Sequence, residues 1–278
     1  MKSKKNLNLP ATTKKYWGGF RPHPFLNSIN PMLLDRGFLP SENVGDGQIV
    51  SWVRDFFPGY FVSLSFWPKN TEKSNPEAFG FASFICIESA RQAEVDRGIG
   101  AWECYKLRPG NAVELPAQSE IVFRAYLDWL AERWGGGEYR LGRWNHVRSS
   151  FHQEIASDVI KVFDNQGEDF LKYISTPEKL ASALLDPYGF PGRREGEFLD
   201  ISPTGVDPEE TAAVLLQDEG NSHAALAALD ASVARVERDI ARGRADQTTL
   251  KIQACKVERY RRWIETGILP NHSASIQA

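Results

Sequence analysis

The segment 139–148 concentrates the side chains best suited to binding a partner. Two aromatic rings and three arginines stand within it, namely Tyr139, Arg140, Arg143, Trp144 and Arg148. Arginines beside aromatic rings can hold phosphates while the rings stack on bases. The same residue types are favoured at the centres of protein interfaces. A structural interpretation also stays open, in which Trp144 covers a sheet and the arginines pair with acidic residues.

His146, His152 and Glu154 form the closest grouping of histidine and carboxylate along the chain. His152 and Glu154 match the first part of a deaminase signature, but no later P-C-x-x-C supplies thiolates. Residues two apart on a helix do not face the same way, so the pair is poorly spaced for zinc. A hydrolase or nuclease around these three residues is therefore only an alternative hypothesis, and we expect no metal site.

Glu103 and Lys106, with Asp96 nearby, suggest nuclease chemistry only loosely, because they lack the spacing of a carboxylate pair that holds two metal ions. No phosphate-binding loop and no nucleophile elbow occurs. The short Gly98–Gly100 motif lacks the third glycine of a dinucleotide loop. We expect no catalytic residues and no cofactor, and a non-enzyme is favoured over an enzyme.

Cys86, Cys104 and Cys255 are an odd, widely spaced set without C-x-x-C. This pattern predicts neither a disulfide scaffold nor a zinc ribbon, and it favours a reducing compartment. No secretion signal and no apolar run long enough to span a membrane is found. We therefore expect a cytoplasmic protein with no membrane contact.

The first half of the chain predicts an antiparallel sheet of about four strands. Strand-like runs cover 48–54, 59–67, 79–88 and 101–107, separated by turns such as Pro58-Gly59. Successive strands without intervening helices favour an antiparallel meander. Before them, Asn27 or Ser28 is expected to cap a short helix that stops at Gly37.

Helical periodicity follows the sheet. From Ser119, the residues Val122, Tyr126, Trp129, Leu130 and Trp134 recur at helical spacing, and a second helix is expected over 151–163. Ser175 or Thr176 begins a further helix. Residues 186–204 are predicted to form a surface linker. Helices at about 223–241 and 246–265 are joined by a short connection, which makes them antiparallel neighbours.

The fold class is therefore α+β, an antiparallel sheet packed by helices and followed by a helical C-terminal region. We divide the chain into a flexible basic arm (1–20), an α+β domain (21–190) and a helical region (205–270). Residues 1–150 carry a net charge of +4 and the remainder −7, and seven of eight tryptophans lie at or before Trp144. Neither half is basic enough to mark a nucleic-acid-binding protein.

The order of short motifs resembles a known family. The motifs are Leu33-Leu34-Asp35-Arg36-Gly37-Phe38, Trp52-Val53-Arg54, the strands 61–67 and 79–85, and the later run 170–180. Over about residues 25–230 they resemble bacterial DUF4304-type proteins, which are small α+β domains with no assigned activity. Similar small bacterial proteins act as toxin-neutralising or interaction modules, so the resemblance implies an immunity-like or defence-associated role.

These patterns together predict a non-catalytic bacterial protein that binds another protein, with Trp144 as an aromatic anchor. The alternative is a nucleic-acid-associated protein that uses the Lys-rich arm and the segment 140–148. We expect no cleft in which ionisable side chains converge. The oligomeric state is left open.

Overall fold

Three of the predicted strands form the centre of a sheet. They are β2 (Val50–Phe57), β3 (Tyr60–Lys69) and β4 (Ala78–Ser89), paired antiparallel in chain order. Gly59 turns the chain between β2 and β3 with a φ of 79°, a left-handed angle that glycine adopts without strain. The computed structural model describes residues 24–41, 49–69, 78–108, 120–134, 143–144, 147–186, 201–202 and 207–269.

The fourth long strand is β5 (Glu120–Tyr126), which pairs antiparallel with β4. The prediction of a helix from Ser119 was wrong for this stretch. A register shift between Ile87 and Glu88 of β4 interrupts the alternation, so the neighbours Val122 and Phe123 are both buried. Two adjacent buried residues conceal the period of two that marks a strand. The chain becomes helical only afterwards, in α4 (Leu127–Trp129) and the π-helix η2 (Leu130–Trp134).

The predicted strand at 101–107 is instead a 3-10 helix, η1 (Ala101–Leu107). Its two buried side chains, Ala101 and Cys104, are three residues apart. That spacing is the repeat of a 3-10 helix, in which residues i and i+3 share one side. An apolar run this short does not distinguish the two structures.

The complete sheet is antiparallel and has the order β1-β2-β3-β4-β5-β7, with β6 beside β4. The three additional strands have two residues each: β1 (Leu39–Pro40), β6 (Val147–Arg148) and β7 (Ile201–Ser202). The α+β class is thereby confirmed, with four long strands as predicted. β7 lies within the predicted linker 186–204 and pairs with β5, so that prediction was wrong at this point, and most of the remaining linker lies outside the described residues.

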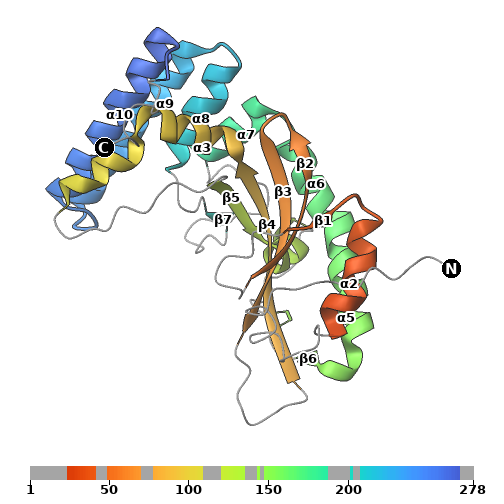
Figure 1. Cartoon of the computed structure of the whole chain (residues 1–278). Coiled ribbons are helices and arrows are strands. Elements are labelled where there is room, and N and C mark those ends of the chain that lie inside the picture. Colours follow the sequence, from red (N-terminus) through yellow and green to blue (C-terminus); the bar gives the residue numbers. More distant parts are fainter. Residues whose placement is uncertain are drawn as a thin grey trace, which may run out of the picture.

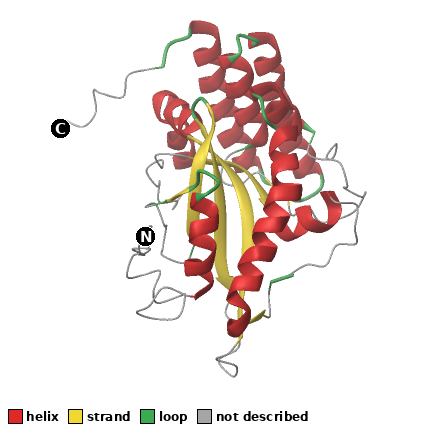
Figure 2. Ribbon diagram, turned by 90° about the vertical axis from the view of Figure 1, so that its right-hand side faces the viewer, coloured by secondary structure: helices red, strands yellow, loops and turns green. Residues whose placement is uncertain are grey.

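Helices α2 (Pro24–Leu34), α5 (His152–Val162) and α6 (Glu168–Tyr173) lie along one side of the sheet (Figures 1 and 2). The prediction that Asn27 or Ser28 caps α2 was wrong, because the helix already begins at Pro24 and Ser28 Oγ donates to the Pro24 carbonyl. Proline suits the first turn, where its missing N–H is not needed. A π-helix, η4 (Phe163–Gly167), joins α5 to α6.

The remaining helices gather beyond the end of β4 (Figure 1). They are α3 (Ala90–Ile99), α7 (Pro177–Leu185), α8 (Pro208–Asp218), α9 (Ser222–Ala241) and α10 (Gln247–Thr266). Thr176 caps α7 and Gly267 ends α10 with a φ of 67°. The antiparallel pairing of α9 with α10 is confirmed. One apolar core runs from Phe25 in α2 to Ile264 in α10, so this helical group shares its core with the sheet.

The two faces of the sheet differ. Val62, Leu64 and Phe66 of β3 point to the helices and belong to the main core. Residues at alternate positions point to the opposite side, which we term the second sheet face; they include Ser51, Val53, Ser63, Ser65, Trp67, Ala82, Phe84, Cys86 and Arg124. Ala82, Phe84 and Cys86 form a small apolar cluster of their own.

A disulfide joins Cys104 of η1 to Cys255 of α10, with their Cα atoms 5.9 Å apart. The expectation of three reduced thiols was therefore wrong for this pair, because folding brings together cysteines 151 residues apart. Sequence spacing gives no sign of such a contact. Within the described residues, no helix combines the length and the apolarity needed to cross a bilayer.

Candidate functional site

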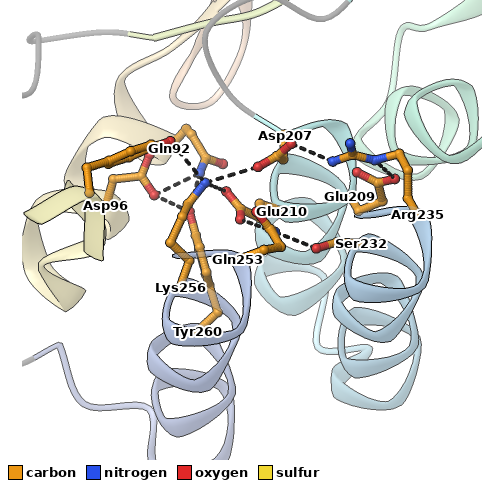
Figure 3. Close-up of polar contacts among 11 residues, drawn as sticks. Gln92, Asp96, Asp207, Glu209, Glu210, Ser232, Arg235, Gln253, Lys256 and Tyr260 are labelled. Atoms are coloured by element: carbon orange, nitrogen blue, oxygen red, sulfur yellow. Dashed lines mark hydrogen bonds and ion pairs between the residues drawn. The ribbon is translucent and has the colours of Figure 1, made fainter. Parts of the chain in front are cut away.

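The largest convergence of ionisable side chains lies inside the helical group, in what we term the interior network (Figure 3). Helices α3, α8, α9 and α10, with the residue before α8, supply its members: Gln92, Asp96, Asp207, Glu209, Glu210, Ser232, Arg235, Gln253, Lys256 and Tyr260. The three α10 members recur at spacings of three and four residues. They therefore share one side of the helix, turned toward the other helices.

Lys256 stands at the centre of the interior network and its side chain is only 5% exposed. Its Nζ lies 2.7 Å from Glu210 Oε2 and 3.1 Å from Asp207 Oδ2. It also donates to the hydroxyl of Tyr105 at 3.5 Å. A buried ammonium of this kind is stable only because carboxylates compensate its lost hydration.

Two groups of contacts extend from this centre. On one side Arg235 donates to Asp207 at 2.5 Å and to Glu209 at 2.8 Å, so Asp207 joins cations from α9 and α10. On the other, Tyr260 donates to Asp96. Further amide donors complete the network: Gln92 Nε2 reaches Tyr260 at 2.7 Å, and Gln253 Nε2 reaches Glu210 at 2.8 Å and Ser232 at 2.5 Å.

Burial and charge shift the pKa values within the network in opposite directions. Burial raises the pKa of Glu210 to about 7, although Lys256 partly opposes this. Burial also raises the pKa of Asp96. For Asp207 the effect of burial is outweighed by Lys256 and Arg235, and its pKa is lowered. Burial would lower the pKa of Lys256, but Glu210 and Asp207 outweigh it and raise that pKa, so Lys256 stays protonated at neutral pH.

This arrangement is suited to holding helices together. A protonated lysine cannot act as a base or a nucleophile. One surface cavity lies beside Arg36 and Asp164 and another beside Cys255 and Arg262, and no member of the network lines either of them. Ionisable groups converge here around contacts between helices: Lys256 and Glu210 are buried, while the side chains of Arg235 and Asp207 stay 32% and 26% exposed. The expectation that no cleft gathers such groups stays a prediction.

The segment predicted to bind a partner is only partly described. Tyr139 and Arg140 lie outside the described residues, and Arg148 is exposed on β6. Arg143 makes a two-point contact with Asp158 of α5 at 2.8 and 3.0 Å. Trp144 donates to the same carboxylate at 3.0 Å. Burial would raise the pKa of Asp158, but Arg143 and Trp144 outweigh it and lower that pKa.

Trp144 is 3% exposed and its ring stacks on Phe81 of β4, with 5.8 Å between centroids and an interplanar angle of 6°. The structure therefore places Trp144 as core cover, one of the three interpretations that the sequence left open. Buried in this way, the ring offers almost no area to a partner, so Trp144 cannot be an exposed aromatic anchor. Partner binding by Arg148 and by the residues outside the described ranges stays a prediction.

The other predicted groupings are dispersed or incomplete. His146 is outside the described residues, while His152 and Glu154 lie in the first turn of α5. Among the residues that the structure describes, no group of three or more His, Cys, Asp or Glu could hold a metal ion. Asp96 belongs to the interior network, Glu103 pairs with Arg259, and Lys106 lies 5.0 Å from the centroid of the Trp102 ring.

An exposed apolar patch lies on the second sheet face near its β1 edge. Leu39 is 66%, Trp67 44% and Ile49 38% exposed. The register pairs Leu39 with Val53, and Val50 with Phe66. Ile49 and Trp67 are therefore the next opposite residues in this antiparallel pair, and both side chains lie on the second sheet face. We term Leu39, Ile49 and Trp67 the apolar patch.

The sequence carried only a faint signal for the interior network. Asp207, Glu209 and Glu210 look like the ordinary acidic start of a helix, since such residues favour the positive end of the helix dipole. Gln253, Lys256 and Tyr260 are the better clue, because they place a polar row along the side of α10 that also carries Val257 and Ile264.

Comparisons with known proteins add no relative: no protein-family model, no curated protein and no solved structure matches the chain. The resemblance to DUF4304-type proteins therefore stays a prediction.

Proposed function

We propose that this protein is a non-catalytic module that binds another protein through its second sheet face. The apolar patch is the observation that carries the proposal. Ile49 and Trp67 are neighbours on one face of the sheet, and Leu39 lies opposite Val53 on the same face, with the half-buried Ser51 and Val53 between them. Exposed apolar groups gathered on one surface are typical of interfaces.

The interior network supports the same proposal. Its ionisable groups form ion pairs and hydrogen bonds between helices, so the largest polar cluster of the described chain is not available for chemistry on a substrate. The alternative functions gain no comparable support. Arg143, expected to contact phosphate, is paired with Asp158, and the histidines of the hydrolase hypothesis are not brought together within the described residues.

The finer parts of the proposal are an immunity-like or defence-associated role in a bacterium and a cytoplasmic location. The first depends on the family resemblance alone. The second is tested by the Cys104–Cys255 disulfide, since cytoplasmic reductants keep most thiols reduced. Trapping the thiols with an alkylating reagent inside intact host cells measures this directly. A fully reduced pair fits the cytoplasm, whereas an oxidised pair indicates an oxidising compartment.

The experiment on function places a photo-crosslinking amino acid at position 67 and, as a matched control, at position 173. Trp67 and Tyr173 are both exposed aromatic residues, but Tyr173 lies at the end of α6 on the helical side. In extract of the native host we expect one discrete crosslinked species from position 67 and none from position 173. The change Leu39→Asp should abolish it. The same products from both positions, or crosslinks only between copies of this chain, would contradict the proposal.

A further inference from the structure

Arg124 occupies the middle of β5 and points to the second sheet face. Its Cα pairs with Cys86 on β4 and with Ser202 on β7. The guanidinium carbon lies 5.1 Å from the centroid of the Phe84 ring and 5.9 Å from that of Tyr126. These two rings are themselves 4.6 Å apart. Contact with two neighbouring rings fixes the guanidinium in place before any ligand arrives.

The hydrogen-bonding capacity of this arginine is unused. Arg124 makes no ion pair or hydrogen bond with any residue in the described ranges, and its Nε is buried without an acceptor. Nine other arginines of the described chain each pair with a carboxylate: Arg36, Arg54, Arg91, Arg108, Arg143, Arg235, Arg259, Arg261 and Arg262. A buried donor without an acceptor is unfavourable. An acceptor supplied from outside would relieve this.

The surroundings favour a polar ligand at the same place. Ser63 pairs with Cys86, the residue that also pairs with Arg124. The Ser63 hydroxyl is fully buried beside the thiol of Cys86, which is only a weak hydrogen-bonding group. Burial raises the pKa of Cys86 to about 12, so the residue between them is a neutral thiol. On this strand pair Cys86 is therefore neutral, and the carboxylate of the same face, Glu88, stands two residues further along β4.

We propose that Arg124 is the anchor for a carboxylate side chain, Asp or Glu, of the protein partner, with the apolar patch contacting apolar groups around it. This rests on the proposed function and specifies the partner's chemistry. The guanidinium fork can donate two parallel hydrogen bonds to one carboxylate. Asp55 and Glu88 share the second sheet face, and their charges disfavour anions there, so a row of nucleic-acid phosphates is opposed more strongly than a single carboxylate.

The test follows the Arg124 Nε–H signal by NMR, since a buried N–H exchanges slowly with water. The probe is sodium phenylacetate, a carboxylate attached to an aromatic ring, and phenylacetamide is its neutral control. We expect a saturable shift with the carboxylate at millimolar concentrations, the usual range for so small a ligand, and none with the amide. Inorganic phosphate should shift the signal less.

Two variants sharpen this test. Arg124→Lys keeps the charge but loses the fork, so we expect phenylacetate to bind at least about fivefold more weakly. Arg143→Gln removes an arginine that is already paired with Asp158, and should leave the titration unchanged. No shift at Arg124 with the carboxylate, or a larger response to inorganic phosphate or to a mixed-sequence oligonucleotide, would overturn the proposal.

Crosslinking from position 67 separates this inference from the proposed function. We expect Arg124→Lys to weaken the crosslink to the host protein. If the crosslink persists at full strength in this variant, the carboxylate anchor is wrong while the binding function stands. If phenylacetate binds at Arg124 but no host protein is crosslinked, the binding function is wrong while the carboxylate site stands.

Discussion

The interior network and the second sheet face differ in whether their cationic side chains have carboxylate partners. In the network, Lys256 and Arg235 are each held by two carboxylates, and the amides of Gln253 and Gln92 donate to Glu210 and Asp96. On the second sheet face, Arg124 rests on aromatic rings and has no carboxylate among the described residues. Charge density is therefore a poor guide to function here, because the denser cluster pairs its charges internally, whereas the sparser one leaves Arg124 without a carboxylate among the described residues.

The difference also separates stability from binding. Changes in the interior network should alter the free energy of unfolding, because each removed partner leaves another group buried without compensation. Changes in the apolar patch should alter binding and leave stability nearly untouched, because Leu39, Ile49 and Trp67 are exposed. The following predictions test this division.

We expect the largest effect from Lys256→Met, which leaves Glu210 buried without its cation and Asp207 with Arg235 alone. The free energy of unfolding should fall by about 3–5 kcal/mol, the usual effect of removing one partner of a buried ion pair. Urea unfolding followed by circular dichroism measures it. Lys172→Met, which removes an exposed lysine, serves as the control and should change stability little. A loss below about 1 kcal/mol in Lys256→Met would show that the network does not hold the helices together.

Reducing the Cys104–Cys255 disulfide should lower stability by about 2–4 kcal/mol, because the bond closes a long loop in the unfolded chain. The measurement is the urea midpoint with and without a phosphine reductant. The double variant Cys104→Ser/Cys255→Ser should be insensitive to the reductant and already destabilised. An equal response of the wild type and the double variant would exclude this disulfide as the cause.

Glu210 should make stability depend on pH. Its folded-state pKa of about 7 lies above the ordinary value of 4.5, so the folded protein keeps a proton that the unfolded chain loses. The contribution of this group is therefore present below pH 4.5 and is lost as the pH rises toward 7, at up to about 1.4 kcal/mol per pH unit. Asp207 acts in the opposite direction, but only as the pH falls below its ordinary value of 3.8.

Urea unfolding at pH 5, 6, 7 and 8 tests this dependence, with Glu210→Gln as the comparison. The amide cannot titrate, so the difference between the two proteins should change between pH 5 and 7 and then level off. Parallel pH profiles for the wild type and the variant would contradict the assignment.

The smallest effect on stability is expected on the second sheet face. Trp67→Ser should change the free energy of unfolding by no more than about 0.5 kcal/mol, since the side chain is exposed. Asp158→Asn, which weakens contacts to both Arg143 and the buried Trp144, is the contrasting variant and should be clearly more destabilising. Thermal unfolding compares the two. Equal losses would show that the apolar patch supports the fold.

Local patterns predicted much of this fold. Val62, Leu64 and Phe66 alternate with serines, so β3 could be recognised from a period of two, and Pro177 after Thr176 marked the start of α7. β5 was predicted as a helix because a register shift buries Val122 and Phe123 together. η1 was predicted as a strand because so short an apolar run does not distinguish the two structures. Tertiary pairing decides such cases, and a single sequence does not contain it in readable form.

The candidate sites were less accessible to sequence reasoning. Trp144 and Arg143 stood out by residue type, yet Trp144 stacks on Phe81 and Arg143 pairs with Asp158. Phe81 is far from Trp144 in the sequence and Asp158 is an ordinary helix residue, so neither contact could be predicted. Arg124 attracted no attention because an isolated arginine in an apolar run usually finds a carboxylate. What distinguishes it is a missing partner, which only the folded structure reveals.

Affinity for the host protein captured through position 67 is the most direct test of binding through the second sheet face. The purified partner would be titrated against the wild type and Trp67→Ser by calorimetry, with Tyr173→Ser as the matched control. We expect Trp67→Ser to raise the dissociation constant at least tenfold, which is a loss of about 1.4 kcal/mol in binding free energy, and Tyr173→Ser to leave it unchanged. An unaltered affinity in Trp67→Ser would contradict binding through this face.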